Sequence, residues 1–204
     1  ISIVDDKGTV NPLILKLLDI TKVEHDGTLS FIVKATQACW LRKPDSERWD
    51  IEKTIENNQQ ELYEIFDKLK MFEKIDPFYQ RYEHAFVLGG LFSRMKTRMQ
   101  FLIDQWNKGV RFNSFVLLAG SRAASSVQGE SQEVLENWIQ QKIETMPETE
   151  TELLKFIYDY IQMPEEMRKI PVIVIDVAMQ KKADGTVVRP NTADTINAWL
   201  KINP

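Results

Sequence analysis

The residues best suited to bind a small molecule follow a short apolar run at residues 85–88. Gly89 and Gly90 come next, and Arg94 and Arg98 then lie four residues apart, on one face of a predicted helix. Backbone N–H groups at the start of that helix and one or two guanidinium groups could hold a phosphate or carboxylate. The alternative is a simple tight turn with solvent-facing arginines, because the glycine pair lacks the full G-x-G-x-x-G spacing.

A second candidate group follows the apolar run at residues 115–119. Gly120, Ser121 and Arg122 precede a loop of small residues, and small residues let a ligand approach the backbone. Glu130 lies eight residues beyond Arg122, where its carboxylate could orient a ligand hydroxyl or act as a general base. Alternatively, Glu130 is only a favourable acid in the first turn of the next helix. G-S-R is not G-x-S-x-G, so no nucleophile elbow is predicted.

A third candidate group follows the apolar run at residues 171–177. Asp176 lies at the end of this run, and Asn191 and Thr192 begin the last predicted helix. A local explanation is available, because Asn191 or Thr192 would cap that helix and Asp194 would lie in its first turn. A ligand-binding role for Asp176, Asn191 and Thr192 therefore depends on their lying near the first two groups.

The three groups come together if the three apolar runs are parallel strands. Helical patterns separate the runs, at residues 91–108, 129–142 and 149–162. This alternation predicts an α/β fold, a Rossmann-like open sheet with parallel strands and right-handed crossover helices. Ligands bind such sheets at the C-terminal ends of the strands, so all three groups would surround one crevice.

The residues before this sheet are predicted to be helical. Residues 1–80 are expected to form a helical N-terminal region that packs on a Rossmann-like α/β domain at residues 81–204. Its helices are expected from Pro12 to the turn at 26–27, at 29–41, and from 45 or 46 to about 72. Asp76 followed by Pro77 marks the break between the two regions.

Composition excludes several classes of protein. The 204 residues are 43% hydrophobic and 27% charged with a formal net charge of -4, which is typical of a globular protein and not of a nucleic-acid-binding surface. No apolar run of about 18 residues is present to span a membrane. The chain begins at Ile1 without the basic and apolar halves of a signal peptide, so an earlier-removed leader or anchor, and a cytoplasmic or periplasmic location, remain open.

Residues for common catalytic or metal chemistry are few. Cys39 is the only cysteine, which excludes an internal disulfide and a Cys-rich zinc site. His25 and His84 are the only histidines, and no Ser-His-Asp triad is predicted from them. Asp176 and Glu130 are two carboxylates without the spacing of a metal site. No metal is therefore predicted, and no cofactor is assigned.

Three motifs of this chain occur in a combination that is typical of one family. They are VLGG with Arg98 downstream, LLAGSR with Glu130 eight residues after Arg122, and PNTADT at the start of a helix. Together, over about residues 82–200, they resemble the bacterial YdcF/ElyC/SanA-like domain family of largely unknown function. The resemblance implies a Rossmann-like fold, a pocket for a nucleotide-like or otherwise anionic small molecule and, in some members, a link to the bacterial envelope. It implies no established reaction.

The chain also departs from that family. Ser121 and Arg122 stand where a glycine pair is usual, and Asp194 and Thr195 stand where Glu-Asn is usual, so the ligand contacts would differ. Family members continue after this helix into another strand. The resemblance therefore implies either a fragment that is incomplete at its C-terminus or a sheet completed by an additional chain, since open sheet edges need covering.

Three functions fit these features. The preferred one is binding of a small anionic or nucleotide-like ligand at the strand ends, with or without catalysis. The second is a protein-interaction module whose helical N-terminal region and exposed aromatic residues, such as Trp40, Trp49 and Trp138, contact a protein partner. The third is a family member that keeps the fold and has lost its chemistry.

Overall fold

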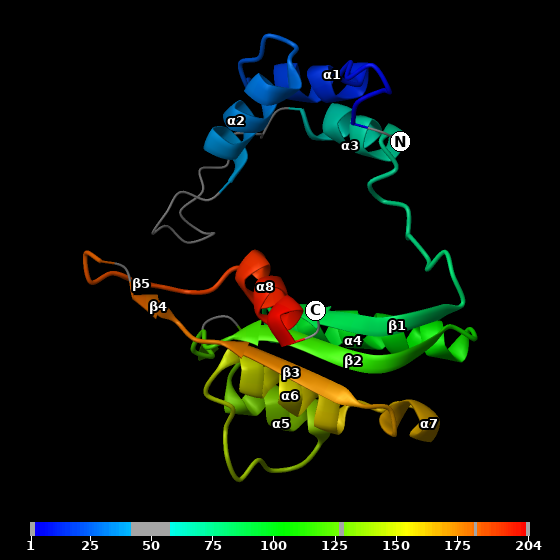
Figure 1. Cartoon of the computed structure of the whole chain (residues 1–204), viewed down its shortest axis with the longest axis vertical. Coiled ribbons are helices and arrows are strands. Elements are labelled where there is room, and N and C mark those ends of the chain that lie inside the picture. Colours follow the sequence, from blue (N-terminus) through cyan, green and yellow to red (C-terminus); the bar gives the residue numbers. More distant parts are fainter. Residues whose placement is uncertain (1–2, 42–57, 127–128, 182, 203–204) are drawn as a thin grey trace. The chain divides into compact units, whose positions relative to one another are not determined.

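The computed structural model describes residues 3–41, 58–126, 129–181 and 183–202 of the chain. The chain divides into two compact units, Ile1–Ile75 and Asp76–Pro204 (Figure 1). Within the described ranges, no helix is long and apolar enough to cross a membrane.

The described part of the first unit contains three helices and an isolated antiparallel bridge between Val4 and Val10. The helices are α1 (Pro12–Ile20), α2 (Leu29–Trp40) and α3 (Gln59–Lys68). Asn11 caps α1 and Thr28 caps α2 through their side-chain oxygens, so the two predicted helix starts are confirmed. Leu17 of α1 packs against Leu62 and Ile65 of α3.

The third predicted helix is only partly confirmed. Its predicted start, with Trp49, Ile51 and Ile55, lies outside the described residues. Its end was placed too late, because α3 stops at Lys68 and Lys70 takes a left-handed conformation with φ 58°. A left-handed residue cannot continue a right-handed helix.

The second unit is a mixed α/β structure around a parallel three-stranded sheet. The strands are β1 (Arg81–Leu88), β2 (Arg111–Gly120) and β3 (Val172–Val177), in the order β1-β2-β3. The three predicted strands are confirmed, but β1 and β2 each begin four residues earlier than predicted. Their first residues include polar side chains that alternate with apolar ones, and the pairing of Arg81 with Arg111 shows that the hydrogen-bonded ladder extends into this polar stretch.

Five helices accompany this sheet: α4 (Phe92–Asn107), α5 (Gln132–Ile139), α6 (Glu150–Tyr160), α7 (Glu165–Arg168) and α8 (Thr192–Ile202). The predicted helix at 129–142 is shortened at both ends, because Ser131 caps α5 and Gln140 adopts a left-handed conformation after it. Sequence analysis missed the short helix α7 and the antiparallel pair β4 (Gln180–Lys181) and β5 (Val187–Val188).

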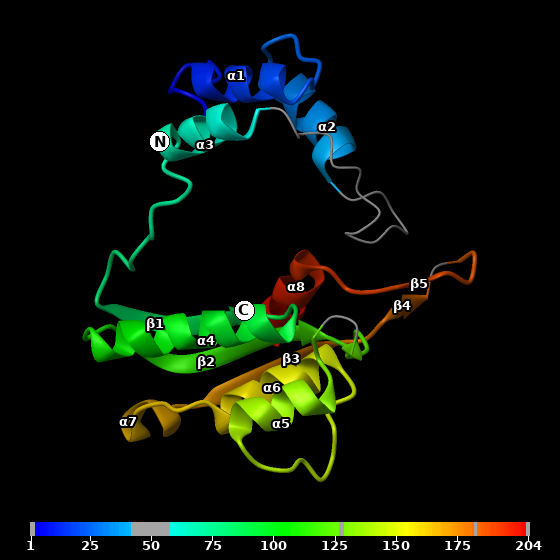
Figure 2. The same ribbon diagram turned by 180° about the vertical axis from the view of Figure 1, so that it is seen from behind.

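The helices cover both faces of the sheet. On one face, α4, α5 and α6 pack against Phe115, Leu117 and their neighbours in one large core. On the other face, α8 packs against Val116, Leu118 and Ile175 through Ala198 and Trp199. Figures 1 and 2 show α8 on one side of the sheet and α5 and α6 on the other. β2 is therefore the central and most buried strand.

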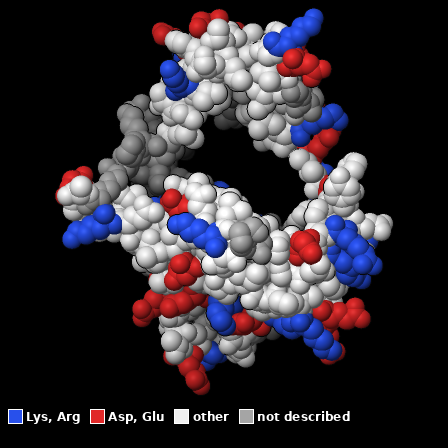
Figure 3. Space-filling model, viewed as in Figure 1, with Lys and Arg blue, Asp and Glu red and all other residues white. Residues whose placement is uncertain are grey.

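The aromatic residues proposed as a partner-binding surface do not share one environment. Trp40 at the end of α2 is exposed. Trp138 of α5 packs edge-to-face on Phe92 and joins the core of the sheet unit, so its interpretation as an exposed contact residue is wrong. Trp49 lies outside the described residues. On the face seen in Figure 3, acidic and basic side chains are interspersed on the second unit.

The core of the second unit predicts a large loss of stability when it is truncated. Leu154 of α6 is fully buried against the sheet, and Leu154→Ala should lower the free energy of unfolding by about 2–5 kcal/mol. Leu200→Ala on α8 is the matched control because Leu200 is about half exposed. Urea unfolding checks both values, and equal losses for the two variants would contradict the described packing.

Candidate functional site

The ends of the three parallel strands lie side by side, as predicted. Leu88 pairs with Leu118, and Gly120 pairs with Val177. The N–H of Gly89 also donates to the carbonyl of Leu118 over 2.6 Å. The residues that follow the three strands are therefore gathered at one edge of the sheet.

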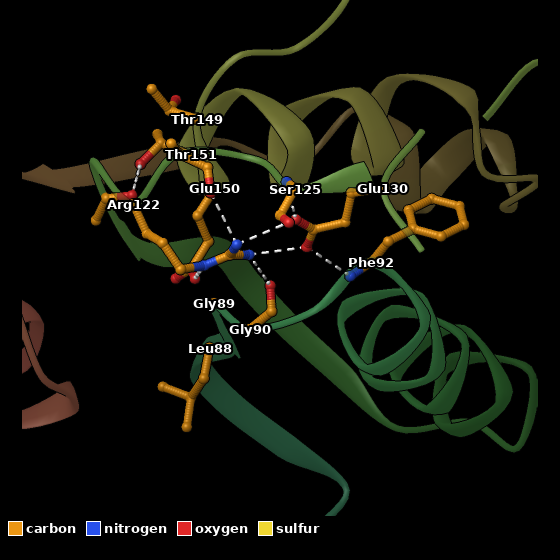
Figure 4. A network of polar contacts seen from close by, with 12 residues as sticks. Leu88, Gly89, Gly90, Phe92, Arg122, Ser125, Glu130, Thr149, Glu150 and Thr151 are labelled. Carbon is orange, nitrogen blue, oxygen red and sulfur yellow. Dashed lines mark hydrogen bonds and ion pairs between the residues drawn. The ribbon is translucent and has the colours of Figure 1, made fainter. Parts of the chain in front are cut away.

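The most extensive contacts at this edge are made by Arg122, which follows β2. Its Nη1 and Nη2 donate to the two carboxylate oxygens of Glu130 over 3.0 and 2.8 Å, and its Nε donates to Glu150 Oε2 over 2.8 Å. The remaining N–H groups reach the carbonyls of Ala123 and Gly90. All five N–H donors of the guanidinium thus have acceptors within the protein (Figure 4).

Glu130 is enclosed by donors in the same way. Its side chain is 0% exposed. Besides the two bonds from Arg122, it accepts hydrogen bonds from the backbone N–H groups of Phe92, over 3.3 Å, and Ser125, over 2.8 Å. Phe92 is the first residue of α4, so the carboxylate of Glu130 lies at the helix N-terminus where a ligand anion was expected.

These contacts change the interpretation of Glu130. It precedes Ser131, the N-cap of α5, so the alternative that placed it in the first turn of that helix is wrong. Its role as a general base stays a prediction. Four donors already use its oxygens, so a ligand hydroxyl would have to replace one of them.

The charge of Arg122 is stabilised in this environment. Burial by itself would lower the pKa of Arg122, but hydrogen bonds to Glu130 and Glu150 and the attraction of the two carboxylates outweigh burial and raise that pKa. The guanidinium therefore remains charged, and a buried cation is tolerated because it is fully hydrogen-bonded and paired.

The glycine pair after β1 makes room for protein side chains. A Cβ atom on Gly89 would lie 2.0 Å from Glu150 Oε1 and 3.2 Å from the Cα of Ala119, and one on Gly90 would lie 3.3 Å from Arg98 Nη1. Gly120 is similar, because a Cβ there would lie 2.3 Å from Pro190 Cγ. The glycines allow the close packing of this edge, whether or not a ligand also approaches them.

Arg98 is fixed to the end of β1 by one nitrogen. Nη1 donates to the carbonyls of Leu88 and Gly89 over 2.7 and 2.6 Å. Nε and Nη2 have no acceptor among the residues that the structure describes. Arg94, one helical turn earlier, is exposed. The half-buried guanidinium of Arg98 is thus anchored and still has donors to offer.

The predicted residues around β3 form a separate set of contacts. Asp176 Oδ1 accepts from Thr151 Oγ1 over 2.7 Å, and Ser121 Oγ donates to the carbonyl of Val177 over 3.1 Å. Asn191 Oδ1 accepts from the N–H groups of Ala193 and Asp194. The local capping role of Asn191 is therefore confirmed, and Thr192 is the first residue of α8.

Glu150 and Thr151 were not singled out from the sequence. Both lie in the first turn of α6, whose N-cap Thr149 forms a capping box with Glu152. A signal was present, because a helix that connects the end of β2 to the start of β3 must begin at the C-terminal edge of the sheet. Polar residues in its first turn were candidates for that reason.

The other reactive side chains belong to β1 or to the first unit. His84, within β1, bonds through Nδ1 to Ser114 Oγ of β2, and His25 contacts Asp19 in the first unit. Cys39 is exposed on α2. In the described part of the chain, no group of three or more His, Cys, Asp or Glu side chains could hold a metal ion.

Comparison with protein-family models, with curated proteins and with solved structures found no match for this chain. The geometry of the strand ends is therefore the basis for any functional assignment.

Removal of the Arg122 side chain should leave the buried charge of Glu130 unpaired. Arg122→Met leaves the carboxylate of Glu130 buried without its cation, so the free energy of unfolding should fall by about 3–5 kcal/mol. Adding Glu130→Gln removes that charge and keeps an acceptor for Phe92 N–H, so the double variant should unfold at higher urea concentration than Arg122→Met. Arg94→Met is the control and should change stability by less than about 0.5 kcal/mol. A double variant less stable than Arg122→Met would contradict the described pairing.

The contact between Gly89 and Glu150 can be tested by a double-mutant cycle. Gly89→Ala forces its new methyl group against Glu150 Oε1 and should destabilise the protein by about 1–3 kcal/mol. In the presence of Glu150→Ala the same methyl group has more room. The two losses should therefore be less than additive by at least about 0.5 kcal/mol in urea unfolding, and additive losses would show that the two residues are not in contact.

Proposed function

We propose that this protein binds a small anionic or nucleotide-like molecule at the C-terminal edge of its parallel sheet. The single observation that supports this most is Arg98. Its guanidinium is anchored to the end of β1 through Nη1, while Nε and Nη2 have no acceptor in the described part of the chain. A fixed arginine with two nitrogens still available is suited to bidentate binding of a carboxylate or phosphate.

The position of Arg98 agrees with a Rossmann-like site. The helices after β1 and β2 cover one face of the sheet, and α8, which follows β3, covers the other face. In doubly wound sheets the crevice forms between neighbouring strands whose following helices lie on opposite faces, at the C-terminal ends of the strands. Here those strands are β2 and β3, and β1 ends beside β2 at the same edge. Gly89 and Gly90 follow β1 at that edge, which supports the Rossmann-like assignment and the resemblance to the YdcF/ElyC/SanA-like family.

The remaining predicted residues fall into two groups. Arg122 and Glu130 neutralise each other and hold the loops of the site, so we propose a structural role for both. Arg94, Ser121, Asp176 and Thr192 lie near the strand ends and can contact a ligand that Arg98 binds. No reaction is proposed. The Ser121 hydroxyl lies 3.5 Å from Asp176 Oδ1, which already accepts from Thr151 over 2.7 Å, and such a long contact does not activate a nucleophile.

Ligand screening tests the proposal directly. Thermal and urea unfolding would be followed with inorganic phosphate, AMP, ADP, glucose 6-phosphate and S-adenosylmethionine. A molecule that binds only the folded protein should add about 2.7 kcal/mol of stability at about 100 times its Kd. For any molecule that does so, Arg98→Gln should weaken the affinity by about tenfold or more, the loss expected for charge-assisted hydrogen bonds.

Arg81→Gln serves as the matched control. Arg81 is exposed at the first residue of β1, at the opposite end of the strand, so its substitution should leave the affinity unchanged. Arg98→Gln also loses the hydrogen bonds of Arg98 to the carbonyls of Leu88 and Gly89, which could lower stability. Affinity would therefore be measured by calorimetry at a temperature where every variant is folded, so that a loss of binding is not confused with unfolding. If neither these five compounds nor any free amino acid or carboxylic acid stabilises the protein, or if Arg81→Gln weakens binding as much as Arg98→Gln, the proposal is wrong.

A further inference from the structure

The carboxylate of Glu150, at the strand ends, is only partly engaged by the residues that the structure describes. Glu150 Oε2 accepts from Arg122 Nε over 2.8 Å, whereas Glu150 Oε1 accepts no hydrogen bond from any described residue. The Glu150 side chain is only 15% exposed. Oε1 is not among the buried atoms without a partner, so it reaches solvent and is free to accept a hydrogen bond from a ligand.

Arg122 by itself does not neutralise the two acids that it contacts. Glu130 and Glu150 are both acidic, and Arg122 is the cation that pairs with both of them. These three largely buried side chains therefore carry one excess negative charge. A positively charged donor at Glu150 Oε1 would neutralise that excess, which is how buried charges are normally accommodated.

Arg98 contacts the same glycine that Glu150 approaches. Its Nη1 donates to the carbonyl of Gly89, while Glu150 Oε1 lies 2.0 Å from where a Cβ of Gly89 would be. No ion pair joins Arg98 to Glu150 within the described ranges. A carboxylate with a free oxygen and a guanidinium with two free nitrogens thus flank Gly89 without neutralising each other.

We propose that these two groups bind a zwitterion of the α-amino acid type. The ammonium group of the ligand donates to Glu150 Oε1, and its carboxylate accepts from Nε and Nη2 of Arg98. Both groups lie next to the backbone of Gly89, so the ligand would bridge them beside this residue. This inference rests on the proposed function and narrows its ligand class, because the site then selects a carboxylate that carries a neighbouring ammonium over a simple anion.

The test compares matched ligands on the wild-type protein. Calorimetry would measure binding of the standard L-amino acids, of the carboxylic acids that lack the amino group, and of the amines that lack the carboxylate. S-adenosylmethionine and 5′-methylthioadenosine extend the comparison to a zwitterion that is part of a larger molecule. A compound with both charged groups should bind at least about tenfold more tightly than the matched compound that lacks one or both of them. The reason is that each charged group makes a charge-assisted hydrogen bond.

Variants then assign the ammonium to Glu150. Glu150→Gln keeps an oxygen for Arg122 Nε and should weaken binding of the zwitterion by about tenfold or more, with little effect on the matched acid without an amino group. Glu148→Gln is the control, because Glu148 is an exposed acid two residues earlier. The comparison of ligands on the wild-type protein remains decisive if Glu150→Gln does not fold.

The possible outcomes separate the two proposals. If acids without an amino group bind as tightly as the amino acids in an Arg98-dependent manner, the zwitterion inference is wrong and the proposed function stands. If no zwitterion, acid or phosphate compound binds, both are wrong. If zwitterions bind but Glu150→Gln and Glu148→Gln affect them equally, the assignment to Glu150 is overturned.

Discussion

The ion pair between Arg122 and Glu130 is the interaction that holds the C-terminal edge of the sheet together. Arg122 follows β2 and reaches the carbonyl of Gly90 after β1 and the carboxylate of Glu150 at the start of α6. Glu130 connects the same cation to the first N–H of α4. Because every donor of Arg122 and each oxygen of Glu130 is used, these buried charges hold several loops in one arrangement.

This arrangement decides what remains available to a ligand. Glu130 supplies a negative charge at the N-terminus of α4, so this helix end is already neutralised from within the protein. A second anion placed there would meet the first one without intervening solvent. The available positive charge is that of Arg98, and the available acceptor is that of Glu150. If Arg98 and Glu150 bind the ligand as we propose, the site matches a molecule with both charges better than a highly charged phosphate.

The sequence predicted the sheet well because its strands differ sharply from their surroundings. Continuous apolar runs such as Val116 to Ala119 reflect burial on both faces, and capping residues such as Asn11 and Ser131 mark helix starts. The helix ends that were predicted wrongly depend on left-handed backbone conformations. Tertiary packing can impose these on residues whose type does not favour them. Gln140 and Lys70 end helices in the left-handed region, although neither is a usual residue for it.

The sequence predicted where the site lies in the fold. It did not predict which side chains contact one another there. Parallel strands must present their C-terminal ends at one edge, so the gathering of Gly89, Gly120 and Asp176 followed from topology. Whether Arg122 pairs with a ligand or with Glu130 depends on distances of a few ångströms, which spacing along the chain does not determine. Glu150 was missed for the same reason, since its importance arises from its approach to Gly89.

The order of the strands in the sheet also bears on how the chain folds. Pairing of β1 with β2 joins residues 30 apart, as for Leu88 and Leu118, whereas pairing of β2 with β3 joins residues 57 apart, as for Gly120 and Val177. Closing the longer segment costs more conformational entropy. The parallel unit of β1, α4 and β2 therefore closes at a lower entropic cost than the pairing of β3 with β2.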